Sequence, residues 1–129
     1  YISQESKYQL TPAIKAVLKK YNVKGSISIK NHSTLVVTIK SGPIDFRTPY
    51  LEGEPPAYYL ESEHADWHKR RRTANRINVN TYSFVAWKGE CRLFLEELHA
   101  AMTDYSDYFD VCWYTDIYIG LLKKPYALR

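Results

Sequence analysis

The sequence predicts an α+β fold: one domain over residues 1–129, with a mostly antiparallel sheet covered on one face by two helices. First, 129 residues is the usual length of a single domain. Second, two segments repeat apolar residues with helical period, and four alternate apolar and polar residues as half-buried strands do. Third, their order is helix, strand, strand, long insert, strand, helix, strand, which is typical of the α+β class.

The first helix is expected over residues 10–25. Thr11 is a favoured N-cap, and Pro12 would take the first helical position, where its missing N–H costs nothing. Apolar residues then repeat at the spacing of a single helical stripe, at Ile14, Val17, Leu18 and Tyr21. Gly25 would end or follow the helix.

Residues 26–43 are expected to form a hairpin. In its first strand Ile27 and Ile29 alternate with serine and lysine. The polar stretch "NHST" is typical of a turn. Apolar residues alternate again in the second strand, at Leu35, Val37 and Ile39, and "SGP" would end it, because Gly and Pro break strands.

Residues 43–75 are expected to be an insert or long loop within the domain. Four prolines punctuate this segment, and it has no clear periodicity. A connector of this length in a small domain is usually functional or mobile. Residues 57–72 could hold a short helix.

The second half of the chain completes the predicted sheet. Residues 76–87 should contain a third strand, in which Ile77, Val79 and Thr81 alternate with polar neighbours. Residues 89–105 should form the second helix, with one apolar stripe at Cys91, Leu95, Leu98 and Met102. The fourth strand would place one set of side chains on a common face: Val111, Trp113, Thr115, Ile117 and Ile119.

Composition removes several classes of protein. No run of about 18 apolar residues is present, so we expect no membrane span, and the first residues lack the apolar stretch of a signal peptide. Two cysteines, Cys91 and Cys112, are too few for a disulfide framework and predict free thiols in a reducing cytoplasm. With five glycines and no nucleophile motif, the sequence leans against an enzyme, and we expect no cofactor.

Charge is segregated along the chain. Residues 1–40 contain seven lysines and one glutamate, and residues 45–68 contain six acids and one arginine. Residues 69–92 contain seven cations and one glutamate, and residues 93–129 contain six acids and three cations. Blocks of this kind create local fields that steer charged partners.

The stretch "HADWHKRRRTANR", residues 64–76, has three interpretations besides a metal site. Arginine forks and neighbouring aromatics are typical of nucleic-acid binding, although the acids upstream would repel a phosphate backbone. The same cations could grip an acidic protein partner, or simply be solvated. The candidate residues are Trp67, Lys69, Arg70, Arg71, Arg72 and Arg76.

A metal site is a weaker interpretation of the same stretch. His64 and His68 are spaced one helical turn apart and could share a metal ion. However, the motif of zinc proteases needs a glutamate directly after the first histidine, and Ala65 stands there. A metal-dependent nuclease is therefore the weakest of the hypotheses, and we expect no metal.

The stretch "TDYSDYFDVCWYTD" is rich in acids and aromatics. Clustered carboxylates can hold Mg²⁺, but the spacing of a calcium-binding loop is absent. The stretch could also be an ordinary loop between helix and strand, or an acidic, aromatic docking surface for a basic partner. The candidate docking residues are Asp104, Asp107, Tyr108, Asp110, Tyr114 and Asp116.

Several stretches resemble proteins of phages and conjugative elements. They are "PAIKAVLKKYNVKGSISIKNHSTLVVTIKSGPIDF", "INVNTY", "FLEELHAAM" and "DYFDVCWYTDIYIGLLKKPY". They are similar to a group of small domains known as large polyvalent protein-associated domains. The similarity covers about two thirds of the chain and leaves out residues 47–75. Cys112 stands where that pattern has glycine. The resemblance implies a mobile genetic element inside a bacterial host, where small phage proteins often block defence systems, as anti-CRISPR proteins do.

Two functional hypotheses follow, besides the nuclease. The leading one is a non-enzymatic inhibitor that binds a host defence complex of CRISPR type through its acidic and aromatic residues. The alternative is a nucleic-acid-binding module that uses the basic segment 69–76. Twelve tyrosines also allow a homodimer.

Overall fold

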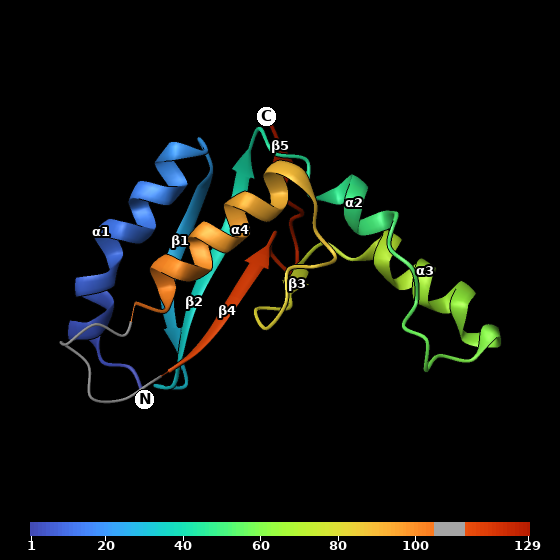
Figure 1. The fold of residues 1–129 in the computed structure, drawn as a ribbon, viewed down its shortest axis with the longest axis horizontal. Coiled ribbons are helices and arrows are strands. Elements are labelled where there is room, and N and C mark those ends of the chain that lie inside the picture. Colours follow the sequence, from blue (N-terminus) through green and yellow to red (C-terminus); the bar gives the residue numbers. More distant parts are fainter. Residues whose placement is uncertain (105–112) are drawn as a thin grey trace.

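The structure, a computed structural model, describes residues 1–104 and 113–129. Its elements are α1 (Gln4–Lys20), β1 (Lys24–Lys30), β2 (Thr34–Gly42), α2 (Arg47–Leu51), the 3₁₀ helix η1 (Glu61–Glu63), α3 (His64–Thr73), β3 (Ile77–Val79), α4 (Gly89–Met102), β4 (Tyr114–Ile119) and β5 (Ala127–Leu128). Figure 1 shows α1 and α4 on one face of the sheet, with α2 and α3 extending beyond it. The predicted α+β class and the order of its main elements are confirmed.

The sheet is mixed. Its strand order is β1-β2-β4-β3, and β5 pairs with the end of β2. The pairs β1–β2 and β3–β4 are antiparallel, whereas β2 pairs in parallel with β4 and β5. The prediction of a mostly antiparallel sheet misses this parallel centre. Parallel neighbours need a long crossover connection, and here that connection contains α4.

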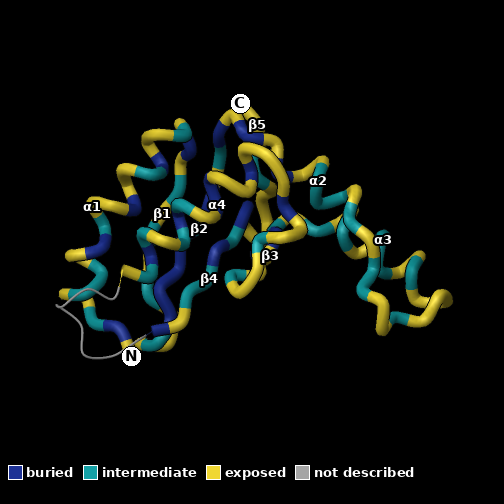
Figure 2. The backbone as a smooth tube through the Cα atoms, in the orientation of Figure 1, coloured by how far each residue is buried: buried dark blue, intermediate teal, exposed yellow. Residues whose placement is uncertain are grey.

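The face of the sheet beneath α1 and α4 forms the core. Leu35, Val37, Ile39, Ile117 and Ile119 are fully buried there. Helix α4 contributes the stripe predicted for it and one further aromatic: Cys91, Phe94, Leu95, Leu98 and Met102. Figure 2 shows this buried interior between the helices and the strands. Apolar area removed from water in this layer is the main source of the fold's stability.

The first helix begins at Gln4, about two turns before the predicted start at Thr11. Ser3 caps it, because its hydroxyl accepts the backbone N–H of Ser6 at 3.1 Å. Pro12 therefore lies inside the helix, on its exposed side, and not at its first turn. Two favourable caps compete in this sequence, and the earlier one prevails.

The end of α1 also differs from the prediction. The helix stops at Lys20, and Asn22 adopts a left-handed conformation with φ of 57°. Gly25 instead belongs to β1, at a register shift in the hairpin. A Cβ atom there would come within 2.5 Å of the Thr38 carbonyl oxygen, so this position requires glycine.

Residues 47–73 form a helical extension at one side of the domain (Figure 1). The short helix predicted within residues 57–72 is observed as η1 and α3. Just before the extension, Phe46 is buried and packs edge-on against Trp87 and Tyr126. In the described part of the chain, no helix has the length and apolar character that crossing a membrane requires.

Candidate functional site

Arg71 connects the two α-helices of the helical extension, α2 and α3. Its guanidinium lies 3.6 Å from the centre of the Tyr50 ring and 4.3 Å from that of Trp67. It also donates to the Tyr50 carbonyl oxygen, from Nε at 3.1 Å and from Nη2 at 2.9 Å. Burial lowers the pKa of Arg71, although a guanidinium remains protonated. Of the predicted binding residues, Arg71 thus holds α3 against α2, and Trp67 packs on the Arg71 guanidinium within α3.

The remaining cations of the basic segment are separated from one another. Arg70 pairs with Asp66 at 3.0 Å on the exposed surface of α3. Lys69 and Arg72 are exposed. Arg76 lies beyond the helix, with its guanidinium 4.1 Å from the centre of the Tyr118 ring on the sheet. Segment 69–76 therefore offers at least two separate surfaces.

The two histidines of the metal hypothesis lie one turn apart on α3. The His68 ring packs edge-on against Trp67, with 4.9 Å between ring centres. Among residues 1–104 and 113–129, no three or more His, Cys, Asp or Glu side chains gather in a way that could hold a metal ion. Nothing in the geometry of His64 and His68 therefore favours a nuclease.

The acidic and aromatic stretch is described only at its two ends. Asp107, Tyr108 and Asp110 lie outside the described residues. Asp104 is exposed just after α4. At the start of β4, Tyr114 is 67% exposed.

An open cleft of about 390 Å³ lies beside these two ends. The loop after β3, the last turns of α4 and the start of β4 line it, through Thr81, Tyr82, His99, Thr103, Trp113, Tyr114 and Thr115. Tyr82 is 89% exposed, so two tyrosines from different elements share the rim. We call this site the tyrosine cleft.

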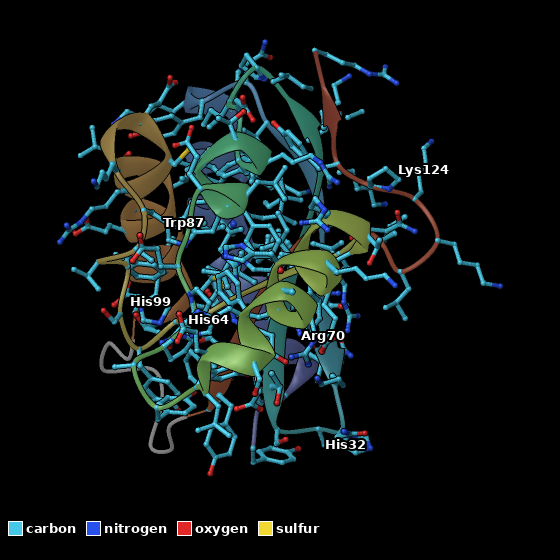
Figure 3. All side chains as sticks on the ribbon, turned by 90° about the vertical axis from the view of Figure 1, so that its right-hand side faces the viewer. His32, His64, Arg70, Trp87, His99 and Lys124 are labelled. Carbon is cyan, nitrogen blue, oxygen red and sulfur yellow. The ribbon has the colours of Figure 1, made fainter. Side chains whose placement is uncertain are left out.

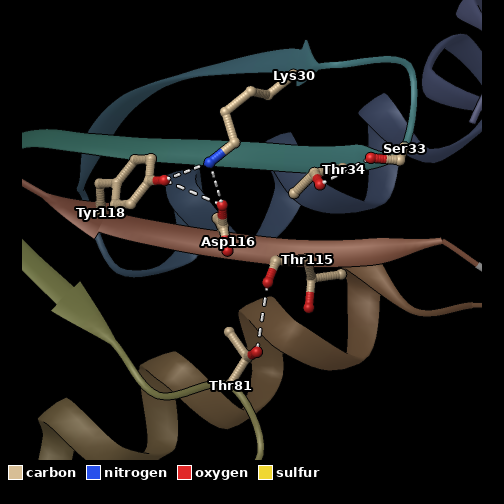
Figure 4. Close-up of polar contacts among 7 residues, drawn as sticks. All are labelled: Lys30, Ser33, Thr34, Thr81, Thr115, Asp116 and Tyr118. Carbon is tan, nitrogen blue, oxygen red and sulfur yellow. Dashed lines mark hydrogen bonds and ion pairs between the residues drawn. The ribbon is translucent and has the colours of Figure 1, made fainter.

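Local hydrogen bonds fix the walls of the tyrosine cleft. Thr81 Oγ1 donates to the Thr115 carbonyl oxygen at 3.3 Å and ties the loop to β4 (Figure 4). The Asn80 side chain accepts the backbone N–H of Tyr82 at 2.9 Å. Trp113 is buried, and its indole donates to the Met102 carbonyl oxygen at 2.9 Å.

His99 is the titratable group of the tyrosine cleft. Its ring packs edge-on against Phe84, with 5.5 Å between ring centres. Burial lowers the pKa of His99, so the imidazole is neutral at pH 7, with one donor and one acceptor nitrogen. The sequence places His99 off the apolar stripe of its helix, but neither His99 nor Tyr82 was among the predicted binding residues.

Asp116 does not line the tyrosine cleft, and strand alternation places it on the sheet face opposite α1 and α4. Its Oδ2 accepts from Lys30 Nζ at 2.8 Å and from the Tyr118 hydroxyl at 3.0 Å (Figure 4). Lys30 also donates to the Tyr118 hydroxyl at 2.9 Å. Hydrogen bonds to Asp116 and Tyr118 raise the pKa of Lys30 to about 12. Asp116 is thus a paired carboxylate within a network that joins β1 to β4.

Known proteins supply no further guide to the site. No family model, curated protein or solved structure matches this chain. A functional assignment therefore depends on the site itself, and the likeness to phage and mobile-element proteins stays a prediction.

Proposed function

We propose that this chain is a non-enzymatic interaction protein of a phage or mobile element, which binds and inhibits a bacterial defence complex of CRISPR type. The observation that supports a docking role is the pair of exposed tyrosines at one cleft, Tyr82 and Tyr114. Tyrosine is enriched at binding hot spots because a rigid ring buries much area at small entropic cost and keeps a hydroxyl for hydrogen bonding.

The polar groups of the tyrosine cleft suit a protein side chain. Thr81, Thr103 and neutral His99 supply donors and acceptors around the apolar rings. Covering a neutral imidazole costs less free energy than covering a charged one. A partner residue inserted between the tyrosines would therefore find both apolar contact and hydrogen bonds.

Charge favours a basic partner surface. Thr103 and Trp113 line the tyrosine cleft and are close in sequence to the two ends of segment 105–112, which contains Asp107 and Asp110. Asp104 is exposed beside it. Acids next to an aromatic anchor steer association toward positive surfaces, such as those with which a defence complex holds nucleic acid.

A plasmid-interference assay tests the proposal. Bacteria that carry a CRISPR system and a matching target plasmid lose the plasmid, and cells that also express this chain should retain it. The Tyr82→Ala, Tyr114→Ala double variant should lose this protection. A matched control is the Tyr8→Ala, Tyr58→Ala double variant, which removes two tyrosines of similar exposure elsewhere and should protect normally.

Two results would overturn the proposal. One is a failure of the wild-type chain to protect the plasmid against every CRISPR type in a representative panel. The other is full protection by the Tyr82→Ala, Tyr114→Ala variant. Circular dichroism and thermal melting of both double variants establish that loss of protection does not reflect loss of folding.

A further inference from the structure

The face of the sheet opposite α1 and α4 is positively charged and, apart from Val36, mainly polar. We call it the open sheet face. Strand alternation places Lys30, Lys40, Asp116 and Tyr118 on it, since their neighbours Ile39, Ile117 and Ile119 point into the core. Within the described strands, Asp116 is the one acid on this face, and Lys30 already neutralises it.

Arg76 and Tyr118 form a stacked pair on the open sheet face. The guanidinium lies 4.1 Å from the centre of the ring, and the Lys30 ammonium lies 5.6 Å from the same centre. Arg76 is partly exposed, and in the described part of the chain it has no carboxylate partner. A guanidinium supported on one side by a ring offers its other side as a platform for a nucleobase.

Further cations continue from this pair. Lys40 lies two residues beyond Thr38, the strand partner of Tyr118, so it is roughly 7 Å further along β2. Lys40, Lys124 and Arg129 line a small pocket of about 130 Å³ at that end of the strand. Figure 3 shows Lys124 on the side of the molecule opposite His99 and α4. The described chain gives none of these three cations an ion-pair partner.

We infer that the open sheet face binds single-stranded nucleic acid, with a base stacked on Arg76 and the adjoining phosphates at Lys40 and Lys124. None of the residues that this site uses lines the tyrosine cleft, although strand alternation places Tyr114 on the same face of β4 as Tyr118. The site also differs from segment 69–76 as a unit, because Arg76 is the only member of that segment that it uses.

The chemistry of the open sheet face favours a single strand over other polyanions. A duplex hides its bases, so it could use the cations but not the Arg76–Tyr118 platform. An acidic peptide likewise offers charge without a flat aromatic ring to stack. Because α1 and α4 lie on the other face, the open sheet face gives splayed bases a broad surface, as the sheets of known RNA-binding modules do.

Fluorescence anisotropy with labelled mixed-sequence 20-nucleotide DNA and RNA tests the inference, at 50 and 200 mM salt. The wild-type chain should bind the single-stranded DNA, the single-stranded RNA, or both, and the ratio of the two affinities identifies the preferred sugar. Binding should be at least tenfold tighter than to the matching duplex or to poly-glutamate. Affinity should fall steeply with salt, since phosphate contacts release counterions.

Matched variants locate the site. Arg76→Gln with Lys40→Gln should weaken binding at least tenfold, and it should reduce the salt slope by only about 0.7, because Lys40 alone of the two is assigned to a phosphate. Lys15→Gln with Lys19→Gln removes the same charge from the exposed side of α1 and should change affinity less than twofold. Arg76→Lys keeps the charge but loses the planar platform, so it should weaken binding while leaving the salt slope unchanged.

Three results would overturn the inference. The first is no binding of either single strand at 50 mM salt. The second is binding of the duplex or of poly-glutamate as tight as that of the single strands, which would indicate charge alone. The third is equal weakening by the two double variants, which would place the contact elsewhere.

Discussion

The two faces of the sheet differ sharply although the same strands build them. In β4, Ile117 and Ile119 are fully buried beneath the helices. Their neighbours in sequence, Asp116 and Tyr118, are partly exposed on the open sheet face. A step of one residue along the strand thus changes the role of a side chain from packing to polar chemistry. In β4, strand alternation thus separates the side chains that pack in the core from those that make polar contacts.

The largest expected effect tests this separation directly. Ile117→Ala should lower the free energy of unfolding by about 2–5 kcal/mol, because it leaves a cavity in a closed core. Asp116→Asn, one residue away, should cost less than about 1 kcal/mol, because its pair with Lys30 is partly exposed. Urea denaturation measures both values, and similar losses for the two variants would contradict the comparison.

The helical extension sharpens the comparison, because there a cation supplies the packing. Arg71→Ala should remove about 1–3 kcal/mol of charge-assisted hydrogen bonding and stacking between α3 and α2. Amide hydrogen exchange in α3 should then accelerate at least about fivefold, with β4 unchanged. Exposed Arg72→Ala is the control; if it accelerates exchange equally, Arg71 does not connect the two helices.

The smallest expected effect is a pH dependence at the tyrosine cleft. Burial depresses the pKa of His99, so the unfolded chain takes up this proton more readily than the folded chain does. The stability that neutral His99 contributes should be present above the ordinary histidine pKa of about 6.5 and be lost as pH falls below it. Thermal melting between pH 5 and 8 should therefore show a flatter profile for His99→Gln than for the wild type. A profile for His99→Gln as steep as that of the wild type would contradict this prediction.

Local patterns predicted the apolar half of this molecule well. The stripe of α4 and the alternation of β2 name buried residues, because burial repeats with the period of the element itself. Predictions failed where two local signals competed, as at Ser3 and Thr11, where the earlier cap begins the helix. They also missed the parallel pairing of β2 with β4, which depends on the path of the whole chain.

The polar half could not be predicted from sequence in the same way. Trp67 and Arg71 were expected to face a partner, but Arg71 contacts Tyr50, which is 21 residues away. Arg76, just before β3, stacks on Tyr118 of β4, and Tyr82 and Tyr114 line one cleft from two separate parts of the chain. The sequence indicates that such residue types favour binding surfaces, but only the folded chain determines which of them lie together.

The central claim is that the tyrosine cleft is the docking site, and affinity for the inhibited defence complex tests it most directly. Biolayer interferometry should show that Tyr82→Ala with Tyr114→Ala weakens binding by at least about 30-fold, the loss of roughly 2 kcal/mol expected of a hot spot. Tyr8→Ala with Tyr58→Ala should bind within about twofold of the wild type. Equal affinities for the two double variants, or a greater loss in the second, would contradict the account.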